Sequence, residues 1–242
     1  MSLDKLDSAL LRYIVTQGFQ PGDRLPALDD LGLELKISVG KLREQLEVAR
    51  TLGLVDVRTR SGIRLEEYTF MPAVRFSLLY ALALDPTQFD AFNLLRNRVE
   101  AAFWYDAVSQ LTPDDHTQLR DLVTKAWAKL NGQPIRIPQP EHRELHLTIF
   151  SRLQNPFVKG LLEAYWEAYE AVGLSVFSDY QYLREVWTYH EKIVDAIEAG
   201  DIDEGHRLLI RHTALLRNRE STHPHAVPER PVNEQAFLAD MS

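Results

Sequence analysis

The chain has 242 residues, of which 45% are hydrophobic and 26% are charged, and its formal net charge is -8. This composition is typical of a folded globular protein and excludes a disordered or fibrous chain. There is no apolar run of the ~18 residues that a membrane helix needs, and the acidic start MSLDKLDSALLRY is unlike a signal peptide, so we expect a cytoplasmic protein with no membrane partner. Because cysteine is absent, thiolate chemistry is excluded, and a metal ion must be held by His, Asp or Glu.

The negative charge is unevenly distributed along the chain. Residues 1–67 carry ten basic and eleven acidic side chains, whereas the remainder carries seventeen and twenty-four. Within the first part, residues 36–64 hold seven basic side chains against three acidic ones. This local excess of positive charge suits contact with a polyanion, although the total charge argues against a protein that coats nucleic acid over its whole surface.

Three helices and a hairpin are predicted in the first part of the chain. Helical spacing of apolar residues predicts helices at Leu3–Gln17, Leu28–Lys36 and Val39–Leu52. Ser38 is a suitable N-cap for the third helix. Apolar and basic residues then alternate around Ser61 and Gly62, a pattern typical of a two-stranded hairpin. The order of these elements is that of a winged helix-turn-helix.

Beyond about residue 68 the pattern is helical. The pairs Asp85-Pro86 and Thr112-Pro113 each place a capping residue before proline, so we expect a helix to begin at each. Residues 131–140 predict a loop, and later helices are predicted at Glu141–Leu153, Pro156–Val172, Tyr182–Ala199 and Asp203–Arg217. The predicted fold is mainly α: a winged helix-turn-helix over residues 1–68, an all-helical bundle over 73–219 and a flexible tail over 220–242.

The winged unit carries the features of a DNA-reading head. In a helix-turn-helix, the N-terminal residues of the second helix approach base edges in the major groove. In this chain those positions hold Ser38, Gly40, Lys41 and Arg43. A wing hairpin needs a tight tip, here Ser61 and Gly62, and cationic side chains that approach the neighbouring backbone or minor groove, here Arg58, Arg60 and Arg64. The alternative is a protein-interaction module whose charges form a solvated face.

Four of the eight histidines are spaced for a metal site in the bundle. His142 and His146 lie one turn apart on one helix face, and His190 and His212 lie symmetrically about the turn at residues 200–201. Two pairs from three helices can converge on one divalent ion, with zinc favoured and nickel also suited. The alternative is that each is an ordinary core or surface residue. The other histidines have no such partners and are expected to be exposed: His116, His206, His223 and His225.

The segments PGDRLP, LDDLGLELKISVGKLREQLEVARTLGLV and RTRSGIRL resemble the N-terminal domain of the GntR family of bacterial transcription regulators. The helical remainder resembles the FCD ligand-sensing domain of the FadR subfamily. The resemblance implies a homodimer, without enzymatic activity, that binds a double-stranded DNA operator under the control of a small organic acid.

Within the winged unit the resemblance matches three family positions: Ser38, Arg43 and Gly62. Two positions depart from the family, because Asp29 and Val39 stand where arginines are usual. Aspartate repels phosphate, and valine cannot make a bidentate contact to guanine. We therefore expect either a different operator or weaker DNA binding, with Lys41 and Arg58 as candidates to compensate.

In the bundle the resemblance matches four positions of the metal-binding FCD branch: His146, Asn155, His190 and His212. His142 stands where aspartate is usual. Imidazole can replace the carboxylate as a ligand but removes one negative charge, so the bound metal ion should attract an anionic ligand more strongly. The alternative is that His142 swings out and leaves three ligands. Arg96 and Glu100 match an arginine and a glutamate of the first sensing helix. Arg96 and Asn155 are therefore the expected effector contacts, although Arg96 and Glu100 also have the spacing of an ordinary surface pair.

Two alternatives to an effector-controlled regulator are considered. A zinc hydrolase would use the histidines of the segment HRELH, but Arg143 stands where that chemistry needs glutamate as general base. A closed four-ligand site would instead make the metal purely structural and DNA binding constitutive.

Overall fold

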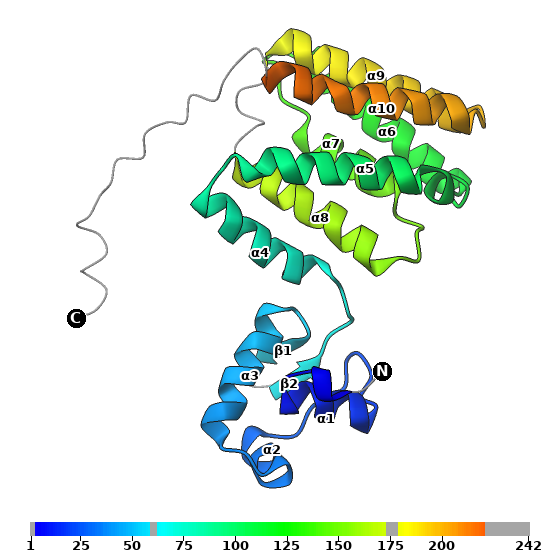
Figure 1. Ribbon diagram of the computed structural model, residues 1–242. Coiled ribbons are helices and arrows are strands. Elements are labelled where there is room, and N and C mark those ends of the chain that lie inside the picture. Colours follow the sequence, from blue (N-terminus) through cyan, green and yellow to red (C-terminus); the bar gives the residue numbers. More distant parts are fainter. Residues whose placement is uncertain (1–2, 59–61, 173–178, 221–242) are drawn as a thin grey trace, which may run out of the picture.

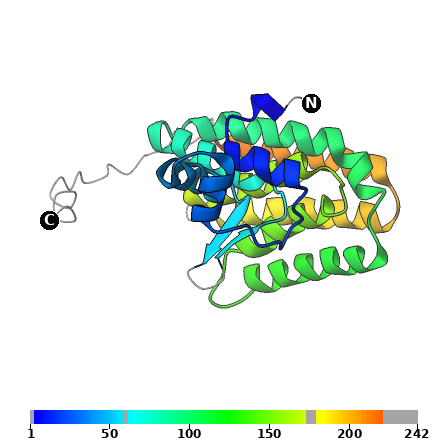
Figure 2. The ribbon, with the colours of Figure 1, turned by 90° about the horizontal axis from the view of Figure 1, so that it is seen from below.

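The computed structural model describes residues 3–58, 62–172 and 179–220. Within these ranges it holds ten α-helices and one two-stranded hairpin, so the predicted mainly α fold is confirmed. Figure 1 shows a small N-terminal unit beneath a larger helical bundle, with helix α4 between them. Seen from below, with the N-terminal unit in front, the long bundle helices run roughly alongside one another (Figure 2). None of the described helices is long and apolar enough to cross a lipid bilayer.

The N-terminal unit contains three helices followed by the hairpin: α1 (Ala9–Gln17), α2 (Leu28–Leu35), α3 (Val39–Thr51), β1 (Val55–Arg58) and β2 (Gly62–Leu65). The first helix begins later than predicted, because Ser8 caps it by accepting a hydrogen bond from the Leu11 amide. Only a short 3-10 turn precedes it. The prediction for α3 is confirmed, since the Ser38 hydroxyl accepts from the Lys41 amide at 3.2 Å.

The hairpin is extended by a third segment. Strands β1 and β2 pair antiparallel, from Val55 opposite Leu65 to Arg58 opposite Gly62. Residues 22–25 run along the other edge of β2, where the Leu25 amide donates to the Ile63 carbonyl at 2.9 Å. The helices and strands bury one apolar core of their own, which includes Leu10, Leu31, Leu42, Val55 and Ile63.

The bundle contains seven helices: α4 (Met71–Leu84), α5 (Gln88–Val108), α6 (Pro113–Leu130), α7 (Gln139–Ile149), α8 (Pro156–Ala171), α9 (Tyr180–Glu198) and α10 (Ile202–Glu220). The start predicted at Asp85-Pro86 is wrong. Asp85 instead ends α4, where its amide donates to the Ala81 carbonyl and its carboxylate accepts from Thr87. The following helix therefore begins at Gln88.

Two further boundaries differ from those predicted. Helix α7 begins at Gln139, two residues early, because Pro140 fits the first turn, where its missing amide proton has no helical acceptor. It also ends at Ile149, before the predicted Leu153. Helix α9 begins at Tyr180 because the Asp179 carboxylate caps it, accepting from the Tyr182 amide at 2.9 Å.

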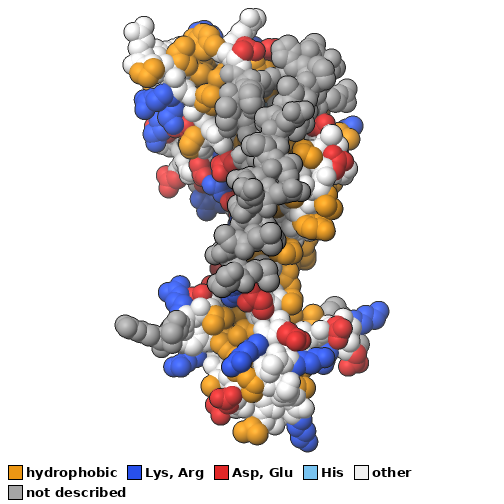
Figure 3. All heavy atoms as spheres, turned by 90° about the vertical axis from the view of Figure 1, so that its left-hand side faces the viewer, with side chains coloured by type: hydrophobic (Ala, Val, Ile, Leu, Met, Phe, Trp, Pro, Cys, Tyr) orange, Lys and Arg blue, Asp and Glu red, His pale blue; other side chains and the backbone are white. Residues whose placement is uncertain are grey.

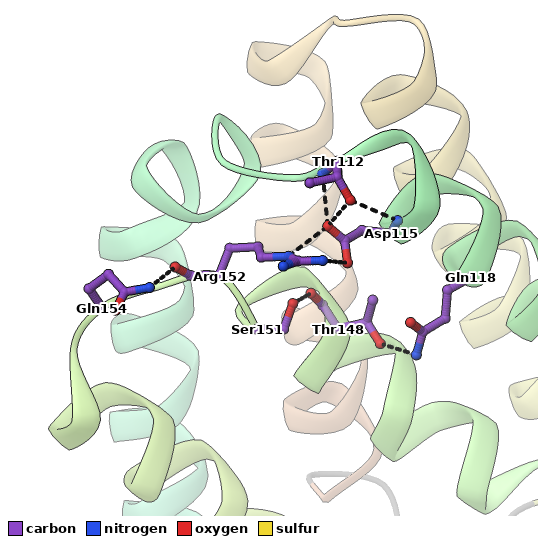
Figure 4. Close-up of polar contacts among 7 residues, drawn as sticks. All are labelled: Thr112, Asp115, Gln118, Thr148, Ser151, Arg152 and Gln154. Carbon is purple, nitrogen blue, oxygen red and sulfur yellow. Dashed lines mark hydrogen bonds and ion pairs between the residues drawn. The ribbon is translucent and has the colours of Figure 1, made fainter.

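The helix start predicted at Thr112-Pro113 is confirmed and forms part of a polar cluster (Figure 4). Asp115 closes a capping box with Thr112 and also accepts two hydrogen bonds from Arg152, at 2.9 and 3.0 Å. Nearby, the Gln118 amide donates to the Thr148 hydroxyl at 3.2 Å. The Arg152 hydrogen bonds hold the pKa of Asp115 well below its usual range. This cluster ties the start of α6 to the chain that follows α7.

The bundle core gathers buried side chains from the six helices α5 to α10, among them Trp104, Leu119, Leu145, Trp187 and Leu209. A second cluster joins α4 to α8, where backbones approach closely at Gly160. A Cβ at that position would lie 2.5 Å from the Met71 amide nitrogen, so only glycine fits there. Helix α4, which leads out of the N-terminal unit, is thereby held directly against α8.

The polar cluster predicts a pH-dependent contribution of Asp115 to stability. Asp115→Asn should lower the free energy of unfolding at neutral pH by about 1–2 kcal/mol, a moderate value because Arg152 is half-exposed. Since the pKa of Asp115 is lower in the folded chain than in the unfolded one, its contribution is present above about pH 4 and is lost as the pH falls below it. Urea unfolding of both proteins at about pH 7, 5 and 3 measures this difference.

The matched control is Asp114→Asn, which removes an exposed carboxylate from the same turn. We expect it to leave stability nearly unchanged. An equal loss in the control, or a loss for Asp115→Asn that persists undiminished at the lowest pH, would contradict the assignment.

Candidate metal centre and nucleic-acid interface

The structure brings together the four histidines that the sequence paired. His142 and His146 come from α7, His190 from α9 and His212 from α10. One ligand nitrogen from each lies within 4.8 Å of the others. Helices α9 and α10 form the antiparallel hairpin that places His190 beside His212. The two residues face each other because they lie at equal distances from the turn at residues 200–201.

The Nε2 atoms of two of these histidines lie close to the Nε2 atom of a third, His190. The Nε2 atom of His190 lies 3.2 Å from that of His146 and 3.1 Å from that of His212. Hydrogen bonds alone cannot satisfy this arrangement, because a neutral imidazole carries one proton and His190 Nε2 faces two other nitrogens. Zinc–nitrogen bonds of about 2.0–2.1 Å at tetrahedral angles separate two ligands by about 3.3 Å, which is close to these spacings. The donor set therefore fits a divalent transition-metal ion.

The histidines are held in the protonation state that metal binding needs. His146, His190 and His212 are buried, and the ring of His142 packs against that of His190 with centroids 4.7 Å apart. Burial lowers the pKa of all four imidazoles well below the ordinary value. They are thus neutral at pH 7, and a neutral imidazole offers a lone pair to a metal.

Glu100 on α5 is a site residue that sequence reasoning did not assign to the histidines. Its Oε1 atom lies 3.1 Å from Nδ1 of His146. A carboxylate at Nδ1 keeps the proton there and directs the Nε2 lone pair to the other side of the ring. The sequence showed the spacing of Glu100 to Arg96, but nothing in it indicated that Glu100 would meet His146, which lies 46 residues further along the chain.

Arg96 lies beside the histidines rather than at the surface. The Arg96–Glu100 pair is fully buried, with Nη2 and Oε1 2.9 Å apart, so the interpretation as a surface pair is wrong. The guanidinium lies 4.6 Å from the centre of the Tyr165 ring and 5.5 Å from that of Trp166. Apart from this ion pair, several buried polar atoms find no hydrogen-bond partner among the described residues: Nε of Arg96, Oε2 of Glu100 and Nε1 of Trp166. Leaving such donors unpaired is costly, so they mark a place for an acceptor.

Asn155 has a local role in the structure. Its Oδ1 atom caps α8 by accepting hydrogen bonds from the Phe157 and Val158 amides. This capping accounts for the side-chain oxygen, and a contact between Asn155 and an effector stays a prediction.

The expectation that the remaining histidines are exposed is wrong for two of them. His206 is half-buried, with Nε2 3.0 Å from the Ala101 carbonyl, because α10 packs against α5. His116 is also half-buried. His223 and His225 lie outside the described residues.

The predicted DNA-reading residues lie together on the N-terminal unit. Gly40, Lys41 and Arg43 are exposed on the first turns of α3, and Gly62 begins β2 at a φ of +76°. Arg58 is exposed, but its Nε lies 2.5 Å from the Asp56 carboxylate, which offsets part of its charge. Arg60 lies outside the described residues. In Figure 3, basic side chains are scattered over this lower unit among acidic ones.

Arg24 is a candidate contact that the sequence interpretation missed, because PGDRLP was considered only as a segment that resembles the GntR family. Its side chain is exposed, and its backbone forms an antiparallel β-bridge with that of Arg64 at the edge of the hairpin. A Cβ on Gly62 would lie 3.0 Å from the Arg24 Nε, so glycine leaves room for this side chain across the wing. Among the described residues Arg24 forms no ion pair, and its charge is free to meet phosphate.

The two departures from the family pattern have local explanations. Asp29 is exposed in the first turn of α2, a helix whose N-cap, Ala27, provides no side-chain hydrogen bond. A carboxylate there stabilises the helix through its dipole. Val39 is half-buried and packs against α2 at Gly32, where a Cβ would lie 3.5 Å from a Val39 methyl group.

Comparisons with known proteins agree with this architecture. The FCD domain family matches residues 93–215. The chain is 24% identical over 208 residues to the HTH-type transcriptional regulator YcbG of Bacillus subtilis, covering 86% of this chain and 85% of that protein. It is 23% identical over 222 residues to the Putative L-lactate dehydrogenase operon regulatory protein of Escherichia coli, covering 88% and 84%.

A solved structure described as Streptococcus agalactiae GntR shares the fold, with a TM-score of 0.63, 20% identity and coverage of 87% of this chain and 96% of that one. These relatives are transcriptional regulators and not enzymes. With an FCD domain that follows a winged helix-turn-helix unit, the chain belongs to the GntR family of transcriptional regulators, in its FCD-containing branch.

Proposed function

We propose that this regulator binds a DNA operator as a homodimer in the cytoplasm, and that a small carboxylate bound at a divalent metal centre in the FCD domain controls that binding. The observation that carries the proposal is the convergence of three buried Nε2 atoms beside a buried arginine with an unpaired donor.

His146, His190 and His212 would hold the metal ion, with His142 as a fourth ligand. An all-nitrogen set of neutral imidazoles favours zinc, and nickel is also compatible with it. When bound, the ion would supply a Lewis-acidic position that accepts a carboxylate oxygen. Glu100 contacts Nδ1 of His146, on the side of the ring away from the other histidines, and so would fix the orientation of this ligand.

Arg96 would bind the effector next to the metal. A guanidinium recognises a carboxylate through two parallel hydrogen bonds. Nε of Arg96 has no partner among the described residues, and Nη2, which is paired with Glu100 at 2.9 Å, would be the second donor. The indole nitrogen of Trp166 offers a further donor from α8. One curated relative bears a name that refers to an L-lactate dehydrogenase operon, which is compatible with a carboxylate signal.

Helices α8 and α4 would carry the signal to the DNA-binding unit. Trp166, on α8, contacts both the Arg96 guanidinium and the His142 ring. Helix α4 is seated on α8 at Gly160, and its Arg75 pairs with Glu167 at 3.3 Å. Movement of Trp166 on effector binding would therefore shift α4 and change the spacing of the two reading heads in the dimer.

The metal proposal predicts that Glu100→Gln weakens metal binding by about 10–100-fold. The amide retains the shape of glutamate but loses the charge that holds the proton on Nδ1 of His146. Competition with a chromogenic zinc chelator measures the affinity. The control, Glu144→Gln, changes an exposed residue of α7 and should bind metal like the wild type. Equal affinity for all three proteins would show that Glu100 does not support a metal ligand.

The DNA proposal predicts that the metal-loaded protein enriches an inverted repeat from a randomised duplex pool, with affinity that falls steeply as salt rises. Carboxylates should then alter that affinity in the wild type. They should have no effect on His190→Ala, which is expected to lose the metal. If His190→Ala lacked metal yet kept its response to carboxylates, the sensing role of the centre would be wrong. Metal loading with unresponsive DNA binding would favour a structural metal.

Arg24→Ala should weaken operator and non-operator binding alike and lower the salt slope by about one. Arg24→Lys should restore most of the binding, because a phosphate contact needs charge more than geometry. Arg207→Ala, which removes an exposed, paired arginine on α10, is the control. Fluorescence anisotropy at several salt concentrations gives these slopes, and an unchanged slope in Arg24→Ala would exclude the contact.

A further inference from the structure

We infer that the effector of this site carries two negative charges, and that His142 sets this preference. The inference rests on the proposed metal centre and goes beyond it by naming the charge class of the ligand, such as a dicarboxylate. It follows from the charges that are buried in the bundle and from the donors that lack partners.

The charged side chains buried in the described part of the bundle already have partners. Arg96 is paired with Glu100 at 2.9 Å. Towards α6, Asp115 is paired with Arg152, and Glu141 is paired with Lys129 at 2.6 Å. None of these carboxylates is left to neutralise an ion bound among the histidines.

The four imidazoles contribute no charge to the site. A divalent ion held by them would therefore bring two positive charges into a buried region, and the Arg96–Glu100 pair, which is neutral overall, would not offset them. Uncompensated charge is costly in the protein interior, so an anion must enter with the ion or after it. A dianion restores neutrality with one molecule, whereas a monoanion leaves one charge uncompensated.

The unpaired donors provide a place for a second carboxylate. Nε of Arg96 and Nε1 of Trp166 have no hydrogen-bond partner among the described residues, whereas Nη2 of Arg96 is held by its ion pair with Glu100. Both side chains belong to the same contact group, since the guanidinium lies 5.5 Å from the Trp166 ring centre. One carboxylate could thus occupy the metal while the other accepts from Arg96 and Trp166. A ligand with a single carboxylate satisfies only one of these two positions.

His142 is the residue that determines the charge of the ligand set. Its ring contacts that of Trp166 edge-on and that of His190, with centroids 4.7 Å apart in both cases, so it adjoins both the histidines and the donor group. An aspartate at this position would supply one of the two missing negative charges from the protein itself. His142→Asp should therefore move the preference from dianions towards monoanions.

The test compares ligands that differ by one carboxylate at similar size: succinate with butyrate, and malate with 3-hydroxybutyrate. Isothermal titration calorimetry on the zinc-loaded full chain at neutral pH gives each affinity, and metal content is measured for every sample. We expect the wild type to bind each dianion at least tenfold more tightly than its partner. We expect His142→Asp to lower that ratio by about tenfold or more. His142→Asn, an uncharged substitution, should keep the wild-type ratio.

Equal affinities for the two members of each pair would overturn the inference while leaving the metal centre intact. An unchanged ratio in His142→Asp with full metal content, or a ratio that falls equally in His142→Asn, would overturn the role of His142. A wild-type protein that takes up no metal would overturn the proposed centre as well, so the two failures are distinguishable. Thermal unfolding with and without each ligand provides a second readout for variants that fold.

Discussion

The rest of the bundle depends on one constraint: in a buried space, Nε2 of His190 on α9 is held 3.2 Å from that of His146 on α7 and 3.1 Å from that of His212 on α10. Neutral imidazoles do not satisfy each other in this arrangement, and without an ion their convergence is unfavourable. Glu100 adds a fourth helix by holding the far side of His146. A metal bound there would cross-link the helices that form the core, so binding and packing would be a single event.

The same centre lies next to the part of the bundle that leads to the N-terminal unit. Trp166 and Tyr165 on α8 contact the Arg96 guanidinium, and the same two side chains share a buried cluster with Leu78 and Leu82 of α4. A ligand that pairs with Arg96 would thus act on the helix that supports the connection. Since α4 follows the winged unit directly in the chain, the proposed mechanism acts through a displacement of α4 that would change the positions of the DNA-binding units.

Much of this arrangement could be predicted from the sequence because it rests on local rules. Ser38 and Thr112 cap helices as expected, and the paired spacings of the histidines follow from helix geometry and the turn at residues 200–201. What could not be predicted depends on contacts between distant segments. Glu100 meets His146 across 46 residues of sequence, and Arg24 reaches the wing only because residues 22–25 pair with β2. The helix start expected at Asp85-Pro86 failed because an acid before proline can also end a helix.

X-ray absorption at the metal edge tests the central claim most directly, since it counts the ligands of a bound ion without a crystal. For zinc-loaded wild-type protein we expect nitrogen or oxygen neighbours at about 2.0–2.1 Å, with the multiple-scattering signature of three to four imidazoles. His190→Ala should lose the metal or one imidazole. A spectrum of an ion surrounded by water and carboxylate oxygens, with no imidazole signature, would contradict the assignment of the histidine cluster as a metal centre.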